Sequence, residues 1–161
     1  MDANKMQKTM LEDAAKLLDG VTTYADLKGI TPAEQEALYQ IGHSCYTTGR
    51  YAEAKKVFRF LAMIHHTSAK YLTALGSAQQ ALGEYQDAVK TYAAAAFFDL
   101  HKPRAHYYAA ECFLALGDFD STISGCRTLL EYCPAGTPEN DKFRPKAETL
   151  LKKAEMMRKG N

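Results

Sequence analysis

Three glycines of this chain, Gly49, Gly83 and Gly117, are separated by the same interval of 34 residues. An aromatic residue follows each of them two positions later: Tyr51, Tyr85 and Phe119. A fixed period of this length is typical of an array of repeated helix pairs, in which no single unit buries its apolar face alone. The period therefore restricts the fold more strongly than any other feature of the 161 residues.

The first two units agree at most of their diagnostic positions when they are counted from Gln35 and Ala69. They share seven identities: Leu38/Leu72, Gly42/Gly76, Gly49/Gly83, Tyr51/Tyr85, Ala54/Ala88, Lys56/Lys90 and Ala62/Ala96. A generic helical bundle with evenly spaced glycines would not produce this agreement. The columns match the tetratricopeptide pattern, in which small residues let two antiparallel helices approach closely. We predict an all-α fold, a tetratricopeptide-repeat superhelix of three helix pairs.

The third unit, counted from Pro103, is a weaker copy. It keeps Gly117, Phe119 and Pro134, but other columns depart from the pattern, with Ala110, Thr122 and Cys126. Terminal repeats commonly depart in this way, because one of their faces meets a cap or solvent instead of another repeat. We therefore count it as a third repeat.

The domain organisation follows from this register. We expect an N-terminal helical segment over residues 1–30, repeats over 31–134 (about 35–68, 69–102 and 103–136) and a C-terminal capping helix over 140–161. Predicted helices span 4–18, 23–28, 33–47, 51–64, 68–81, 85–98, 103–115, 119–131 and 144–159. The Pro- and Gly-containing stretch 133–140 predicts a loop.

The first helix carries an apolar stripe whose members are Met6, Met10, Leu11 and Leu17. Such a stripe needs a partner surface. It predicts either a homodimer interface or a helix that folds back on the first repeat, and the sequence does not separate the two.

Composition excludes several classes of function. Lys plus Arg (20) nearly balance Asp plus Glu (19), so no electrostatic footprint for nucleic acid or anionic membranes is visible. The longest apolar stretch, 92–98, is far shorter than the roughly 20 residues that span a bilayer. The N-terminus lacks the apolar region of a signal peptide, and the four cysteines form no C-x₂-C pair. We expect a protein of a reducing cytosol.

No catalytic motif stands out either. The chain has no H-E-x₂-H, no nucleophile elbow and no phosphate-binding Gly-rich loop, although His65, His66, His101 and His106 are numerous around the repeats. We predict no enzyme activity, no metal site and no cofactor.

The concave face of such a superhelix is lined by the first helix of each repeat, and positions 2, 5, 9, 12 and 13 of that helix point into it. These positions are Glu36, Tyr39, His43, Tyr46 and Thr47, then Lys70, Thr73, Ser77, Gln80 and Ala81, then Arg104, Tyr107, Glu111, Leu114 and Ala115.

Tyrosine at three of these positions, Tyr39, Tyr46 and Tyr107, is informative, because the repeat pattern does not demand it. Tyrosines suit a surface that captures an apolar peptide yet stays soluble when empty. Their alternative role is packing against the N-terminal segment or a neighbouring chain. The polar members could hydrogen-bond the backbone of an extended ligand.

Two stretches resemble a particular family more closely than the generic repeat does. Asp99-x₃-Pro103-Arg104 is followed by Ala109-Ala110-Glu111-Cys112, and Gly49-Arg-Tyr-Ala-Glu-Ala-x₂-Val-Phe58 precedes them. In these residues the chain resembles the class II chaperones of bacterial type III secretion systems, over about residues 8–132.

The resemblance implies a chaperone of the bacterial cytoplasm that binds one or two hydrophobic translocator proteins before secretion. It implies an extended segment of a Pro-x-Leu-x₂-Pro kind in the concave groove, and homodimerisation through the N-terminal helices. The matching groove positions are Tyr39, Tyr46 and Tyr92, with Ile64 as an apolar neighbour. By its repeat column, however, Tyr92 is a core residue that could at most edge the groove. A Lys, Asn and Arg clamp for a C-terminal carboxylate is missing, since its sites include Ala74 and Tyr108. The repeats alone also fit a general scaffold or regulatory adaptor.

Overall fold

The computed structural model describes residues 3–18 and 22–160, and all regular secondary structure within them is helical. The helices are α1 (Ala3–Leu18), α2 (Tyr24–Lys28), α3 (Pro32–Thr47), α4 (Tyr51–Ile64), α5 (Ala69–Ala81), α6 (Tyr85–Phe98), α7 (Pro103–Ala115), α8 (Phe119–Tyr132) and α9 (Pro138–Lys159). The predicted all-α fold is confirmed. None of the helices in these two ranges is long and apolar enough to cross a membrane.

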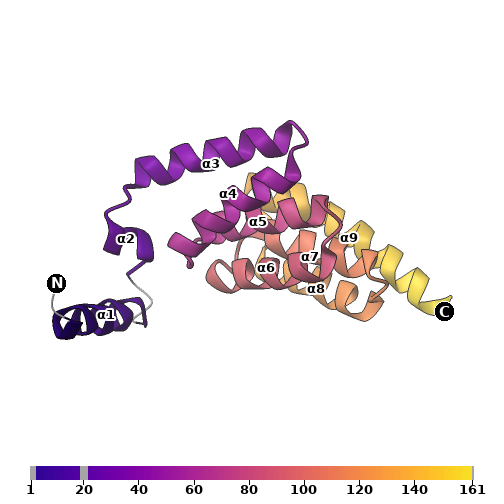
Figure 1. Ribbon diagram of the computed structural model, residues 1–161. Helices are drawn as coiled ribbons and strands as arrows, with labels where there is room; N and C mark the ends of the chain where they lie inside the picture. The colour runs from indigo at the N-terminus through magenta and orange to yellow at the C-terminus, as the bar shows by residue number, and fades with distance from the viewer. Residues whose placement is uncertain (1–2, 19–21, 161) are drawn as a thin grey trace.

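Helices α3 to α8 form three consecutive antiparallel pairs that stack into a curved array (Figure 1). The helix α9 lies along α7 and α8 at one end of the array, and α1 and α2 lie at the other end. The two ends of the described chain are therefore far apart. The first helices of the pairs, α3, α5 and α7, follow one another along one side.

The three periodic glycines are the turns inside the pairs. Gly49, Gly83 and Gly117 have φ angles of 78°, 76° and 75°. This left-handed conformation favours glycine, which has no Cβ to clash with the backbone. The 34-residue period thus records the turn that reverses the chain between the two helices of each repeat.

The array begins at a capping box. Thr31 Oγ1 accepts a hydrogen bond from the backbone N–H of Glu34 at 3.3 Å, and Glu34 Oε2 accepts from the backbone N–H of Thr31 at 2.8 Å. These bonds satisfy donors that a helix start leaves open. The Thr31 hydroxyl also donates to Glu34 Oε2 at 2.7 Å, and this bond, followed by the one from the Thr31 N–H, lowers the pKa of the Glu34 carboxyl. Pro32, at the first helical position, completes the start of α3.

A second pair of glycines sets the distance between the helices of a repeat. A Cβ on Gly42 would lie 2.6 Å from Cε1 of Phe58, and a Cβ on Gly76 would lie 2.7 Å from Cε1 of Tyr92. Both distances are below van der Waals contact. In each of the first two pairs, therefore, an aromatic ring of the second helix fills the space that glycine leaves on the first.

The C-terminal helix starts earlier than the sequence indicates. We expect a loop through residue 140 and a helix from 144, whereas α9 begins at Pro138. Thr137 caps this start by accepting a hydrogen bond from the Asn140 N–H at 3.1 Å. Pro138 takes the first helical position, where a backbone N–H would have no partner within the helix, so the N–H that proline lacks is not missed. Pro145 lies inside α9. The helix continues through it because Phe143 and Ala147 on either side are buried.

The helix α1 exposes its apolar stripe. Met6, Met10 and Leu11 are 50%, 65% and 66% exposed, and Figure 1 shows α1 standing away from the repeats. The side chain of Leu17, like the predicted helix end at residues 19–20 and the last residue, 161, lies outside what the structure describes. In this conformation the stripe does not fold back on the first repeat.

Candidate peptide-binding groove

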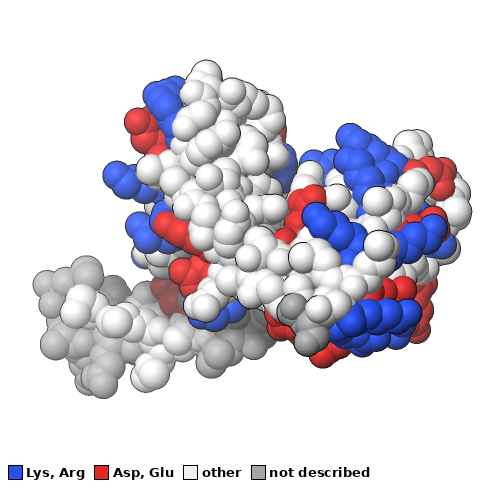
Figure 2. Space-filling model, turned by 90° about the vertical axis from the view of Figure 1, so that its right-hand side faces the viewer, with Lys and Arg blue, Asp and Glu red and all other residues white. Residues whose placement is uncertain are grey.

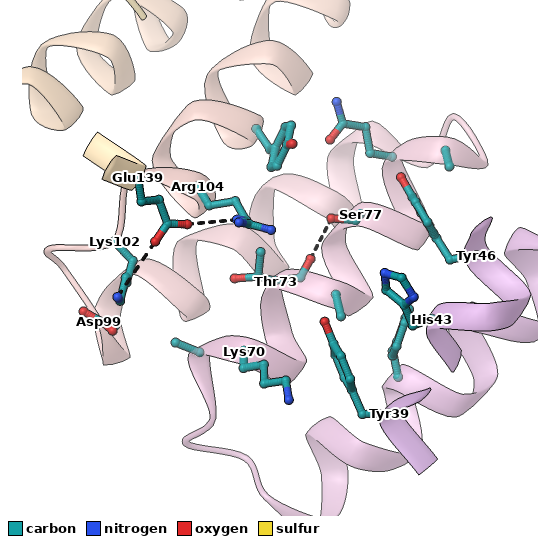
Figure 3. Close-up of a pocket in the computed structure, with 16 residues that line it drawn as sticks. Tyr39, His43, Tyr46, Lys70, Thr73, Ser77, Asp99, Lys102, Arg104 and Glu139 are labelled. Carbon is teal, nitrogen blue, oxygen red and sulfur yellow. Dashed lines mark hydrogen bonds and ion pairs between the residues drawn. The ribbon is translucent and has the colours of Figure 1, made fainter. Parts of the chain in front are cut away.

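A cavity of about 630 Å³ lies along the inner side of the array, between α3, α5 and α7 (Figure 3). Its wall also takes residues from the loop before α7 and from the first turn of α9. The lining residues are Tyr39, His43, Tyr46, Phe58, Ala69, Lys70, Thr73, Ala74, Ser77, Gln80, Ala81, Asp99, Lys102, Arg104, Tyr108 and Glu139.

The α3 wall is aromatic. Figure 3 shows Tyr39, His43 and Tyr46 reaching from α3 toward α5. The Tyr39 ring lies 5.7 Å from that of Phe58, centroid to centroid, and the Lys70 Nζ lies 3.9 Å from the Tyr39 centroid. This cation–π contact holds the ring in place at the edge of the cavity.

The other tyrosine of the α3 wall is also fixed by its neighbours. Tyr46 packs edge-on against Tyr51 at 5.2 Å. Burial raises the pKa of its phenol, so this side chain stays a neutral hydrogen-bonding group at physiological pH. The α3 wall therefore offers apolar ring faces with polar tips.

The floor of the cavity is a chain of hydrogen bonds. The hydroxyl of Tyr92 donates to Gln80 Oε1 at 2.9 Å and lies 3.1 Å from Ser77 Oγ. Gln80 Nε2 in turn donates to Glu111 Oε2 at 3.2 Å. Because their side chains are held in this way, Ser77 and Gln80 present fixed polar groups, which orient a ligand in an otherwise apolar site.

The far end of the cavity is charged. Glu139 accepts a hydrogen bond from Arg104 Nε at 3.1 Å, and its other carboxylate oxygen lies 3.8 Å from Lys102 Nζ. Figure 3 shows Asp99 beside Lys102 at the outer edge. The cavity therefore changes from aromatic at α3 to ionic at α7 and α9.

The charges on one face of the molecule are unevenly distributed. Figure 2 shows two lobes with a hollow between them. Lys and Arg alternate with Asp and Glu over the lobe on the right, whereas much of the upper lobe on the left is uncharged. Neither sign dominates this face, as the net charge of +1 indicates.

Most of the residues that we assigned to a groove from the sequence lie together in this wall: Tyr39, His43, Tyr46, Lys70, Thr73, Ser77, Gln80 and Arg104. Glu111 lies just behind it and reaches it through Gln80. Peptide binding by these residues stays a prediction.

Three predicted residues lie elsewhere. Ile64 and Tyr92 are 0% exposed, because they fill the core between the helices, so neither lines the groove. Tyr107 packs on Phe143 of α9, with 5.4 Å between ring centroids. Burial raises the pKa of its phenol, and Glu111 contributes to the shift. The covering helix α9 thus takes Tyr107 from the groove and leaves that place to Tyr108.

Some lining residues were not signalled by the repeat pattern. Phe58 belongs to a core column, and Asp99 and Lys102 lie in a loop, while Glu139 belongs to a stretch that we predicted as loop. Tyr108 and Ala74 were considered only as sites of a missing clamp. The spacing Asp99-x₃-Pro103-Arg104, which carries the family resemblance, was the available signal for the charged end.

Comparisons with known proteins agree with this architecture. The tetratricopeptide repeat family matches residues 35–59 and 73–123. The low calcium response locus protein H of Yersinia pseudotuberculosis is 32% identical over 134 residues, which cover 83% of this chain and 79% of that protein.

Solved structures are similar over most of the chain. A T3SS complex from Aeromonas hydrophila contains a chain 31% identical to this one, with a TM-score of 0.87, covering 93% of this chain and 99% of that one. The type III secretion chaperone SycD of Yersinia enterocolitica is 29% identical. It was solved with a peptide of the translocator YopD (TM-score 0.74, covering 80% of this chain and 98% of SycD) and as an alternative dimer (TM-score 0.74, 80% and 97%).

The repeat register, the cavity and the sequence identity to these relatives over most of their length all indicate the same family. This chain belongs to the LcrH/SycD family, the class II chaperones of type III secretion translocators.

Proposed function

We propose that this chain holds an extended segment of a hydrophobic translocator protein in the cavity between α3, α5 and α7, and so keeps that partner soluble and competent for export from the bacterial cytoplasm. The observation that carries the proposal is the composition of the wall. Aromatic side chains from α3 face fixed polar groups from α5 across about 630 Å³. Such a site suits a few apolar side chains on a hydrogen-bonding backbone.

The physical role is shielding. A translocator carries apolar segments destined for a membrane, and exposed apolar surface leads to aggregation in water. When one anchor segment lies in the groove, the partner stays incompletely folded. A groove that recognises extended backbone and a few pockets also accepts more than one partner. This role requires binding without chemistry, so we propose no enzymatic activity.

Two relationships support this proposal over a general scaffold or regulatory adaptor. SycD, which shares the fold and 29% of the residues, was solved with a peptide of the translocator YopD. The LcrH relationship extends over 134 residues, 83% of this chain, and so reaches far beyond a single repeat.

A blocked groove tests the proposal. Ala81 is exposed at the end of α5 and lines the cavity, so Ala81→Arg fills the groove without disturbing the core. Ala52→Arg on α4 is the matched control, since Ala52 is exposed and lies outside the cavity. In co-expression with a hydrophobic translocator protein, we expect the wild type and Ala52→Arg to keep the translocator soluble and Ala81→Arg to lose most of it to the pellet. Equal rescue by all three would overturn the proposal.

We also propose that the free chaperone is a homodimer and that α1 supplies the interface. The exposed stripe of Met6, Met10 and Leu11 supports this, because apolar side chains on one helix face need a partner surface. Removal of residues 1–20 should halve the mass measured by light scattering. An unchanged dimer mass would show that the interface lies elsewhere.

A further inference from the structure

We infer that the α7 end of the groove binds a side-chain carboxylate of the translocator segment, so that the preferred ligand carries an Asp or Glu beside its apolar anchor. This inference rests on the proposed function and adds a chemical requirement to it. Its centre is Arg104, whose guanidinium faces the cavity.

The three cationic side chains of the wall differ in how they are paired. Three cationic side chains, Lys70, Lys102 and Arg104, line the cavity with two carboxylates, Asp99 and Glu139. Lys70 is already engaged, since its Nζ lies 2.6 Å from Glu36 Oε2 and against the Tyr39 ring. The remaining two cations share one carboxylate, that of Glu139.

Arg104 is held in a fixed orientation from behind. Glu139 bonds to its Nε, and its Cζ lies 6.0 Å from the ring centroid of the buried Phe143. Both partners belong to α9. Figure 3 shows the guanidinium pointing from α7 toward Thr73 and Ser77, away from α9.

This geometry leaves the terminal nitrogens available. Within residues 3–18 and 22–160, Arg104 makes no ion pair other than that to Glu139, which uses Nε. The two Nη groups of an arginine can donate to a carboxylate in a bidentate manner. A ligand carboxylate above Thr73 would meet these donors without displacing Glu139.

Among the described residues, the neighbouring carboxylates do not pair with the terminal nitrogens of Arg104, and Glu111 on the same helix accepts from Gln80 Nε2. Asp99 lies beside Lys102 at the outer edge, and Glu139 lies on the α9 side of Arg104 (Figure 3). The wall continues beyond Arg104 to Lys102 and Asp99. A segment that contacts both the α3 tyrosines and Arg104 therefore runs on past it, which favours an internal Asp or Glu over a chain terminus.

Charge exchange between protein and peptide tests the inference. We would measure the affinity of short peptides, acetylated and amidated at their ends, that carry a Pro-x-Leu-x₂-Pro core and Glu, Gln or Lys at each flanking position in turn. At one position the Glu peptide should bind wild-type protein about two- to fivefold more tightly than the Gln peptide at low salt. Arg104→Gln should remove this preference, and Arg104→Glu should reverse it toward Lys.

The control is Arg127→Gln. Arg127 pairs with Glu155 of α9 at 3.1 Å, the distance of the Arg104–Glu139 pair, but lies on α8 outside the cavity. The Arg127→Gln variant should still bind the Glu peptide more tightly than the Gln peptide. Equal binding of Glu and Gln peptides to the wild type, or equal loss of both in Arg104→Gln, would overturn the inference while leaving groove binding intact. If no peptide binds at all, the proposed function fails as well.

Discussion

The second and third helix pairs solve the same packing problem in opposite ways. In the second pair, Gly76 on α5 leaves room for the ring of Tyr92 on α6, which is 0% exposed. In the third pair the equivalent residues are Ala110 on α7, larger than the glycine, and Cys126 on α8, smaller than the tyrosine. Both pairs are filled, yet neither could accept the side chains of the other.

The two pairs differ at these positions because a different element packs against each of them. Tyr92 fills the space between α5 and α6 and stacks on Tyr108 of the following repeat, at 5.9 Å. The third pair is followed by α9, whose Leu150 packs into one cluster with Ala110 and Cys126. A departure from a repeat pattern is therefore informative, because here it marks the surface that receives a different helix.

The largest effect should come from placing the glycine-and-ring arrangement of the second helix pair in the third pair. Cys126→Phe places a ring where Ala110 and Leu150 already fill the space, so we expect the free energy of unfolding to fall by about 3 kcal/mol. Ala110→Gly alone should lower the free energy of unfolding by about 1 kcal/mol. Combined with Cys126→Phe, it should instead raise that free energy by about 1 kcal/mol relative to Cys126→Phe alone. Urea unfolding followed by circular dichroism measures all three. Simple additivity would show that Ala110 and Cys126 do not compensate each other.

The reverse change in the second pair should have the next largest effect. Gly76→Ala brings a Cβ to 2.7 Å from Tyr92 Cε1. Overpacking of about 3 kcal/mol exceeds the roughly 1 kcal/mol by which alanine favours a helix, so unfolding should become easier by about 2 kcal/mol. Thermal and urea unfolding check this.

Gly125→Ala is the matched control, because its Cβ would meet Ala110 Cβ at an ordinary 3.4 Å. It should be neutral or stabilising by up to about 1 kcal/mol. If both glycines behaved alike, close packing would not distinguish the two pairs.

The smallest effect should come from the polar tip of Tyr92, which has no counterpart on Cys126. Tyr92→Phe keeps the ring and removes the donor to Gln80 Oε1, which should cost about 1 kcal/mol of stability. It should also loosen Gln80 and weaken peptide binding severalfold. A variant that lost stability but kept full affinity would separate the core role of this residue from the groove.

The two cysteines of the third pair do not differ in thiol reactivity. Burial raises the pKa of both thiols, that of Cys112 to about 12 and that of Cys126 to about 11. Both are buried and remain protonated at physiological pH. Cysteine at these positions serves as a small apolar side chain.

Much of the fold could be predicted because it is written in local signals. Left-handed glycine turns, the Thr31 capping box and repeated columns depend on neighbouring residues, and the helices of the repeats begin and end within a few residues of the predicted bounds. The start of α9 could not be predicted in this way. Pro134, Gly136 and Pro138 suggest a loop, and only packing against α7 and α8 starts the helix at Pro138 and carries it through Pro145.

The groove was predictable where it depends on one helix and not where several elements meet. The α3 and α5 positions follow from the helical period, so Tyr39, Tyr46 and Ser77 lie where the register places them. At the α7 end the same register selects Tyr107, but Phe143 of α9 covers that residue and Tyr108 lines the cavity instead.

The sequence by itself determined the repeat, its turns, the family and the aromatic character of the α3 wall, because these depend on local conformation and on a period that is visible along the chain. Tertiary structure alone decided that Ile64 is core, and that Glu139 joins Arg104 at the charged end. The physical reason is that burial and ion pairing between residues about 35 positions apart depend on how helices pack, and the helix α9 has no repeat column to announce where it lies.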